Sequence, residues 1–184
     1  MSVLEVNKLT PLASNGTITL GDSGDTFSIP SGVTLSNAGT ATGFGKIGQV
    51  VSVATTTARS TTSSSFTAVS DMTLNITPTA TSSKIYLSAM QTMSFANSGG
   101  YWSHVTIFKN GSNLSANDNG LGAMRTNTGD NYITIPLIYM DSPSSTSQQT
   151  YQIYFRSPNG INVGYNSLSS GASLVAMEVL AWAH

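Results

Sequence analysis

Few residues of this chain could perform catalysis, because cysteine is absent and the histidines are His104 and His184 alone. His184 is the last residue, and His104 precedes the apolar positions Val105 and Ile107, where we expect a histidine at the surface or rim of a sheet. A hydrolase of the nucleophile-elbow type would need Gly-x-Ser-x-Gly, which does not occur. The lack of cysteine also excludes disulfides and thiolate metal sites. We predict that the protein is not an enzyme and needs no cofactor.

Oxygen ligands for a metal occur in two short segments, Asp22–Asp25 and Asn117–Gly120. Calcium takes such ligands, but neither segment has the spacing of a calcium-binding EF-hand loop, and we predict turns at both. Glu178 stands apart, because the segment around it is otherwise apolar. A carboxylate in such a segment could be a buried, hydrogen-bonded partner of a Lys or Arg. Alternatively, three copies of Glu178 near a trimer axis could form a ring that binds a cation. We expect the paired role and no metal site.

Aromatic and amide residues in the predicted loops are the best candidates for a ligand site. Aromatic rings stack on sugar rings, and side-chain amides hydrogen-bond to sugar hydroxyl groups. A receptor glycan would suit both groups, whereas the alternative is that these are ordinary loop residues and that Trp102 is half-buried in packing. The candidates are Tyr101, Trp102, Asn97, Asn117, Asn119, Arg125 and Asn127.

The composition indicates a folded protein that associates with other proteins. Charged residues make up 8% of the chain and the net charge is −1, so neither a nucleic acid nor an anionic membrane is an expected partner. No apolar run reaches the roughly 20 residues of a membrane helix, which argues against membrane insertion. Hydrophobic residues still amount to 39%, which argues against disorder. A surface rich in Ser and Thr suits contact with other protein copies.

From residue 46 onward, short segments of alternating polarity recur, and none shows a helical period. Asn110-Gly111 predicts a tight hairpin turn, because both residues tolerate positive φ. Many short strands with turn-rich connections predict an all-β antiparallel sandwich or jelly roll. The predicted strands are 49–54, 66–69, 72–76, 85–90, 105–107, 132–140, 151–155, 161–165 and 174–183.

Two predicted strands, 132–140 and 174–182, are apolar on both faces. Such strands are covered on both sides, and in a sandwich of this size the second cover would be another subunit, or else loops of the same chain. Pro136 cannot donate to a ladder, so its strand should lie at an edge or carry a bulge. We predict an obligate oligomer, with interface residues Ile133, Ile135, Leu137, Tyr139, Val175, Met177, Val179 and Trp182.

Residues 1–45 read differently from residues 46–184, which form the second predicted domain. Apolar pairs at Ile18/Leu20, Phe27/Ile29 and Val33/Leu35 are separated by Gly, Asp, Asn or Pro, which predicts very short strands joined by tight turns. Such strands cannot form a core alone. We therefore predict an extended stem or attachment segment that buries its apolar residues against copies of itself or against a partner surface.

Several segments resemble a known group of proteins. The N-terminal segments SVLEVNKLT (2–10), GDSGDTFSIPSGVTL (21–35) and GFGKIGQV (43–50) resemble the start of small virion proteins, often described as tail-fibre proteins, of marine and cyanobacterial phages. The remainder is similar to the C-terminal domain of the same group, which looks like a trimeric jelly roll of the C1q/tumour-necrosis-factor kind. The segments that carry this second resemblance are ITPTATSSKI (76–85), FKNG (108–111), YMDSP (139–143) and AMEV (176–179).

The resemblance implies a homotrimer in the virion, with residues 1–45 docked on other virion proteins and residues 46–184 forming a jelly-roll knob. It favours a tail-fibre or fibre-like component of a bacteriophage that serves in host attachment, with a host surface glycan as a partner. The alternative is a capsid decoration or cement protein that stabilises the head shell. A small carbohydrate-active enzyme is the least favoured class.

Overall fold

The computed structural model describes residues 17–19, 22–26, 28–33, 47–95, 99–126 and 131–180. The chain divides into two compact units, Met1–Thr42 and Gly43–His184. Among the described residues, no helix is long and apolar enough to cross a membrane.

The described residues of the first unit form turns. The amide of Asp25 donates to the carbonyl of Asp22 at 3.1 Å, and the amide of Val33 donates to the carbonyl of Pro30 at 3.2 Å. The predicted turn at Asp22–Asp25 is confirmed. The predicted strands are wrong for Ile18, Ile29 and Val33, which lie in no strand and are exposed. Such short segments have no described neighbour to pair with. Leu20, Phe27 and Leu35 lie outside the described residues.

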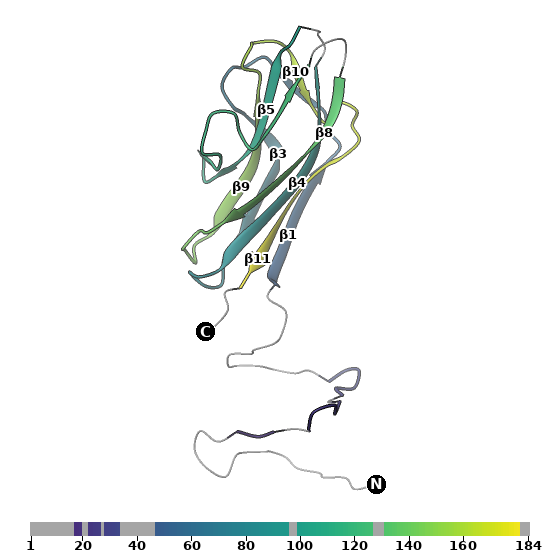
Figure 1. The fold of residues 1–184 in the computed structure, drawn as a ribbon, viewed down its shortest axis with the longest axis vertical. Helices are drawn as coiled ribbons and strands as arrows, with labels where there is room; N and C mark the ends of the chain where they lie inside the picture. The colour runs from purple at the N-terminus through teal and green to yellow at the C-terminus, as the bar shows by residue number, and fades with distance from the viewer. Residues whose placement is uncertain are drawn as a thin grey trace. The chain divides into compact units, whose positions relative to one another are not determined.

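The second unit is an antiparallel β-sandwich, as the alternating pattern predicts (Figure 1). Its strands are β1 (Ile47–Thr55), β2 (Arg59–Thr61), β3 (Thr67–Ile76), β4 (Lys84–Phe95), β5 (Trp102–Lys109), β6 (Ser112–Asn113), β7 (Gly122–Arg125), β8 (Asn131–Asp141), β9 (Gln149–Arg156), β10 (Val163–Tyr165) and β11 (Ala172–Val179).

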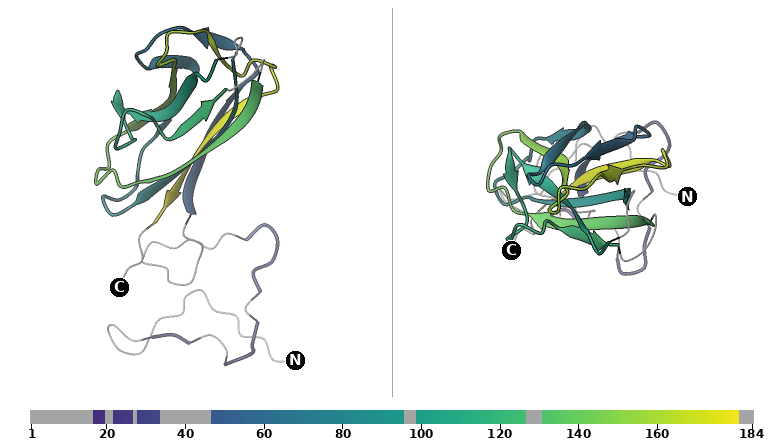
Figure 2. Two further views of the ribbon diagram at one scale, coloured as in Figure 1. Left: turned by 45° about the horizontal axis from the view of Figure 1, so that its top comes forward. Right: turned by 90° about the horizontal axis from the view of Figure 1, so that it is seen from above.

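The strands form two sheets, called here sheet A and sheet B (Figure 2). Sheet A has the order β1-β11-β4-β10-β2, and β8 also pairs with β4. One edge of β4 pairs with β8 along almost its whole length. The opposite edge of β4 pairs first with β11 and then with β10. Sheet B has the order β3-β9-β5-β6, and β7 also pairs with β5. The chain therefore crosses repeatedly between the sheets. The crossings are β2 to β3, β3 to β4, β4 to β5, β7 to β8, β8 to β9 and β9 to β10.

The core lies between the sheets, because every second side chain of each long strand points inward. Ile85, Leu87 and Met93 of β4 face Ile107 of β5 and Ile153 of β9, and all are fully buried. The aromatic rings of Phe155 and Tyr165 lie 5.6 Å apart between their centroids. Side chains at alternate positions point away from this core, so each sheet has an outer face that is free to carry function.

Two local predictions about backbone geometry are confirmed. Asn110 and Gly111 have φ values of 49° and 84° and connect β5 to β6 as a tight hairpin. Pro136 lies in β8, which pairs with β4 alone among the described strands, so the strand is at an edge. The pairing of β8 continues through Pro136 opposite Met90 without a bulge.

Glu178 is buried as the sequence suggests, but its partners are different from those expected. Its Oε1 accepts hydrogen bonds from the amide of Thr79 at 2.6 Å and from the Thr79 hydroxyl at 2.7 Å. Its Oε2 accepts from Nε2 of Gln49 at 2.8 Å. Burial acts to raise the pKa of Glu178, but the hydrogen bonds from Gln49 and Thr79 prevail and hold it below its ordinary value. The expected pairing with Lys or Arg is wrong, and a buried carboxylate enclosed in its own chain cannot join a ring of three.

Candidate functional site

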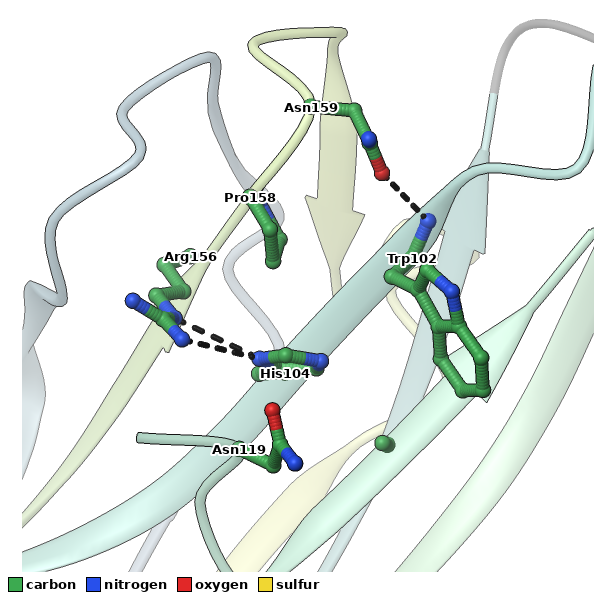
Figure 3. A pocket seen from close by; sticks show the side chains of 7 residues that line it. Trp102, His104, Asn119, Arg156, Pro158 and Asn159 are labelled. Carbon is green, nitrogen blue, oxygen red and sulfur yellow. Dashed lines mark hydrogen bonds between the residues drawn. The ribbon is translucent and has the colours of Figure 1, made fainter. Parts of the chain in front are cut away.

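The outer face of sheet B carries a pocket of about 350 Å³ beside the exposed indole of Trp102 (Figure 3). We call it the Trp102 pocket. Three strands and two loops form its walls. The residues that line it are Trp102, His104, Asn119, Ala123, Arg156, Pro158 and Asn159.

The strand register brings the floor of the pocket together. His104 of β5 pairs with Ala123 of β7 on one side and with Arg156 of β9 on the other, so the three side chains form one row across the outer face. Trp102 lies two residues before His104 and so points to the same face. Because Ala123 is small, the row is hollow on the β7 side of His104. The pocket occupies this hollow.

The loop between β6 and β7 covers part of the outer face and forms one wall. Side chains fold it back on itself: Asn113 Oδ1 accepts from the amide of Ser115 at 3.0 Å, and Asn117 Oδ1 accepts from the amide of Asn119 at 2.9 Å. The loop is attached to β5 by the amide of Leu121, which donates to the carbonyl of Val105 at 3.1 Å. The segment Asn117–Gly120 is a turn, as predicted.

The turn after β9 forms the opposite wall. The amide of Gly160 donates to the carbonyl of Ser157 at 3.0 Å, which places Pro158 and Asn159 at the tip of the turn. Oδ1 of Asn159 accepts from the amide of Trp102 at 3.0 Å (Figure 3). This bond fixes the orientation of the Asn159 amide, so its Nδ2 group is a hydrogen-bond donor at the edge of the pocket.

Arg156 determines which ring nitrogen of His104 accepts a hydrogen bond. Nε and Nη2 of Arg156 both lie 3.3 Å from Nδ1 of His104, and the guanidinium can only donate. Nδ1 is therefore the acceptor, and the hydrogen of the ring is on Nε2. Burial and the neighbouring charge of Arg156 lower the pKa of His104. His104 is 6% exposed, so the expected surface position is wrong, because the loop between β6 and β7 covers its ring.

Arg156 is fixed in place by its other contacts. It donates through Nη1 to the carbonyl of Ser64 at 3.3 Å and through Nη2 to the carbonyl of Asp118. Its guanidinium carbon lies 4.8 Å from the ring centroid of Phe66. The two ion pairs between described residues are Arg59–Asp71 and Lys109–Asp141, so Arg156 brings a positive charge to the pocket that no described carboxylate pairs with.

The predicted ligand residues are only partly brought together. Trp102 and Asn119 line the pocket, and the Arg125 guanidinium lies 5.7 Å from the Trp102 ring centroid. Asn117 is in the neighbouring loop and orients Asn119. Tyr101 is half-buried and packs against the core. Asn97 and Asn127 lie outside the described residues.

Sequence reasoning missed Arg156, Pro158 and Asn159 and assigned His104 to the surface or rim of a sheet. Arg156 directly follows the predicted strand 151–155, and the Pro158-Asn159-Gly160 segment has the composition of a turn. These signals place the residues at one end of β9, but the sequence does not say that β9 lies beside β5. Only the pairing of the two strands brings these residues to Trp102.

The outer face of sheet A is a second candidate site, because it is largely apolar and its central rows carry no charge. Strand pairing aligns its outward side chains into three rows across β1, β11, β4 and β8. We call them the sheet A rows. They are Val50-Met177-Tyr86-Met140, Ser52-Val175-Ser88-Ile138 and Ala54-Ser173-Met90-Pro136.

The sheet A rows are open to solvent in the single chain. Val50, Met90, Ile138 and Met140 are 57%, 53%, 64% and 46% exposed. Contiguous exposed apolar surface of this kind marks contact sites in soluble proteins. The alternative expectation, that loops of the same chain cover the second face of strand 132–140, is not met by any described loop.

The interface residues expected on β8 need a correction. Ile135 and Leu137 are 7% and 1% exposed and lie in the core of the sandwich, so they cannot contact another copy. Tyr139 is half-buried against the same core, and Ile133 is 43% exposed near the end of the strand. The outward side of β8 instead carries Ile138 and Met140.

The interface residues expected on β11 lie on the outward side. Val175 and Met177 belong to the sheet A rows, and Val179 lies beyond them opposite Lys84; all three are half-buried between neighbouring strands. Trp182 lies outside the described residues.

Among the described residues, no group of three His, Asp or Glu side chains is placed to hold a metal ion. The arrangement offers a different chemistry: donor groups and an aromatic face in the Trp102 pocket, and an uncharged apolar surface on sheet A. No protein-family model matches the chain, and comparison with curated proteins finds no significant match.

Proposed function

We propose that the protein is a structural component of a bacteriophage virion, a trimeric fibre-like protein in which sheet A joins the copies and sheet B faces outward for host attachment. The observation that carries the assembly is the exposure of the sheet A rows, which extend without a charge across four strands. The virion setting rests on the resemblance of residues 2–10, 21–35 and 43–50 to small phage virion proteins. A second copy of the chain is the occupant that we assign to this surface, because an exposed apolar face without charges suits contact with the similarly uncharged surface of another copy.

The topology supports a jelly roll for the knob. Sheet A contains the first and last strands as neighbours, β1 and β11, and the chain between them crosses repeatedly from one sheet to the other. This is the order that two Greek keys produce. We assign the contact between copies to the broad outer face of sheet A.

Placement of the remaining parts follows from this assignment. If sheet A is covered in the trimer, the outer face of sheet B and its Trp102 pocket remain accessible. Residues 1–45 are proposed to dock on other virion proteins. The pocket is then available for contact with a glycan on the host surface.

Light scattering on the purified chain tests the assembly. We expect three times the mass of one chain, and a monomer for Ile138→Asp, which places a charge in the middle sheet A row. Asn75→Asp is the matched control, because it adds the same charge on sheet B and keeps the acceptor for the Thr150 hydroxyl. A wild-type monomer, or an Ile138→Asp trimer, contradicts the proposal.

The copy number of the protein in virions tests its role. A fibre component is present in tens of copies or fewer, whereas a decoration protein is present in hundreds. Quantitative mass spectrometry of purified particles separates the two. Hundreds of copies per particle would contradict the attachment role and favour a decoration protein that stabilises the head shell.

A further inference from the structure

We propose that the Trp102 pocket binds a sugar that carries a carboxylate, such as a uronic or nonulosonic acid residue. This inference rests on the proposed function, since it names the class of glycan that the outward face would recognise. Three properties of the pocket carry it: an unbalanced positive charge, an exposed aromatic plane and a set of fixed hydrogen-bond donors.

The charge comes from Arg156. No carboxylate is among the residues that line the pocket, and the guanidinium is enclosed by carbonyl groups and an imidazole, none of which neutralises it. Partial burial weakens the screening of such a charge by water. The pocket therefore favours an anion over a neutral group at the Arg156 end.

The aromatic plane comes from Trp102. Its side chain is 42% exposed at the mouth of the pocket (Figure 3), and the Arg125 guanidinium lies 5.7 Å from the ring centroid. The amide of Trp102 is bonded to Asn159, which fixes the backbone from which the indole projects. A pyranose ring is flat and apolar on one side, and it can cover such a plane, whereas a small inorganic anion would leave it exposed.

The donors lie between these two ends. His104 holds its hydrogen on Nε2, the ring nitrogen opposite the one that Arg156 occupies, and Asn159 and Asn119 present side-chain amides from the two walls (Figure 3). A carboxylate and the ring hydroxyl groups both accept hydrogen bonds. Hydrogen bonds to an ionised acceptor are roughly twice as strong as neutral ones. Along the pocket, the positive charge is followed by the hydrogen-bond donors and then by the aromatic plane. This order matches the carboxylate, the hydroxyl groups and the ring of an acidic sugar.

Matched sugar pairs test this proposal with the full-length protein. The probes are D-glucuronate against D-glucose, D-galacturonate against D-galactose, and N-acetylneuraminate against its methyl ester, each titrated by calorimetry and by saturation-transfer NMR. We expect at least one acid to bind about tenfold more tightly than its neutral counterpart, a ratio that corresponds to about 1.4 kcal/mol. That preference should shrink when NaCl is raised from 0.05 to 0.5 M.

Variants locate the binding. Trp102→Ala should abolish binding of the preferred acid, and Arg156→Gln should remove the preference for the acid over its neutral counterpart. Ala123→Phe should fill the hollow and abolish binding while the residues that contact Arg156 are left unchanged, and circular dichroism checks that the variant folds. Arg59→Gln is the control, because Arg59 pairs with Asp71 outside the pocket. Binding that survives Ala123→Phe, or that is lost in Arg59→Gln, would place the sugar elsewhere and overturn the assignment.

The oligomeric state of the same sample separates the two proposals. A trimer that binds none of the three acids, or binds acids and neutral sugars equally, overturns the pocket assignment and leaves the assembly intact. A monomer that prefers an acid sugar through Trp102 contradicts the assembly and leaves the pocket assignment standing.

Discussion

The hydroxyl of Tyr151 donates to Oδ2 of Asp141 across 2.6 Å, and this bond joins the two sheets, because Tyr151 belongs to β9 and Asp141 to β8. Nζ of Lys109 lies 3.0 Å and 2.9 Å from the two carboxylate oxygens of Asp141. Burial and the adjacent Asp141 raise the pKa of Tyr151 strongly, so the phenol remains a donor at any physiological pH. The three residues form a polar contact at the edge of an otherwise apolar core.

Removal of this contact should destabilise the knob. We expect Asp141→Ala to lower the free energy of unfolding by about 3 kcal/mol or more, because it leaves Lys109 and Tyr151 without their acceptor. Tyr151→Phe should cost about 1–2 kcal/mol, since one hydrogen bond is lost and the ring remains. Arg59→Gln removes a more exposed pair and should cost less than about 1 kcal/mol. Urea unfolding measures all three, and equal losses for Asp141→Ala and Arg59→Gln would contradict the assignment.

Acid should weaken the fold through Glu178. Its pKa is depressed in the folded chain, so the ionised form contributes stability above the unfolded pKa of about 4.3, and this contribution is lost as the pH falls through the folded value. Glu178→Gln should therefore flatten the dependence of the melting temperature on pH between about 2 and 5. Part of the dependence should persist, because a hydrogen bond from Thr55 likewise lowers the pKa of Asp71. An unchanged pH profile in Glu178→Gln would disprove this role.

Gly120 should tolerate no side chain. It has a φ of +73°, and a Cβ there would lie 2.7 Å from the carbonyl oxygen of Val105 in β5. Gly111 has a similar φ of +84° but open space around it, which makes it the matched control. We expect Gly120→Ala to cost about 2–3 kcal/mol and Gly111→Ala about 1 kcal/mol.

Hydrogen exchange gives a local measure of the Gly120 substitution. The amide of Leu121 should lose protection in Gly120→Ala, because its bond to Val105 is broken when the loop moves away. If both alanine variants unfold alike, close packing of the loop on β5 is not what requires glycine.

The association of copies should resist salt. The sheet A rows contain no charged residue, and Lys84 lies beyond them, so the proposed contact between copies would depend on apolar burial. We expect the sedimentation coefficient of the oligomer to be unchanged between 0.05 and 1 M NaCl. Dissociation at high salt would indicate that ion pairs hold the copies together and that another surface forms the contact.

The fold was largely predictable from the sequence, because period-2 alternation and the Asn110-Gly111 turn act locally. Which face of β8 points into the core could not be predicted from the sequence. Its residues are apolar on both sides, so alternation did not indicate whether Leu137 or Ile138 belongs to the core. The Trp102 pocket was half predictable for a related reason: Trp102 and Asn119 stand out by type, whereas Arg156 reaches them only through the pairing of β9 with β5.

The two apolar faces of β8 also bear on how the chain avoids misfolding. If β8 slipped by one residue along β4, Ile138 and Met140 would enter the core and Leu137 would leave it, at little cost in buried hydrocarbon. The correct alignment must then be selected by polar groups: Nε2 of Gln91 donates to the carbonyl of Ile135, and Asp141 meets Lys109 and Tyr151 only in the observed pairing. A slipped strand would leave that carboxylate buried without partners and would alter the shape of the outer surface. The polar contact of Asp141 therefore favours the observed alignment of β8 over an alignment shifted by one residue.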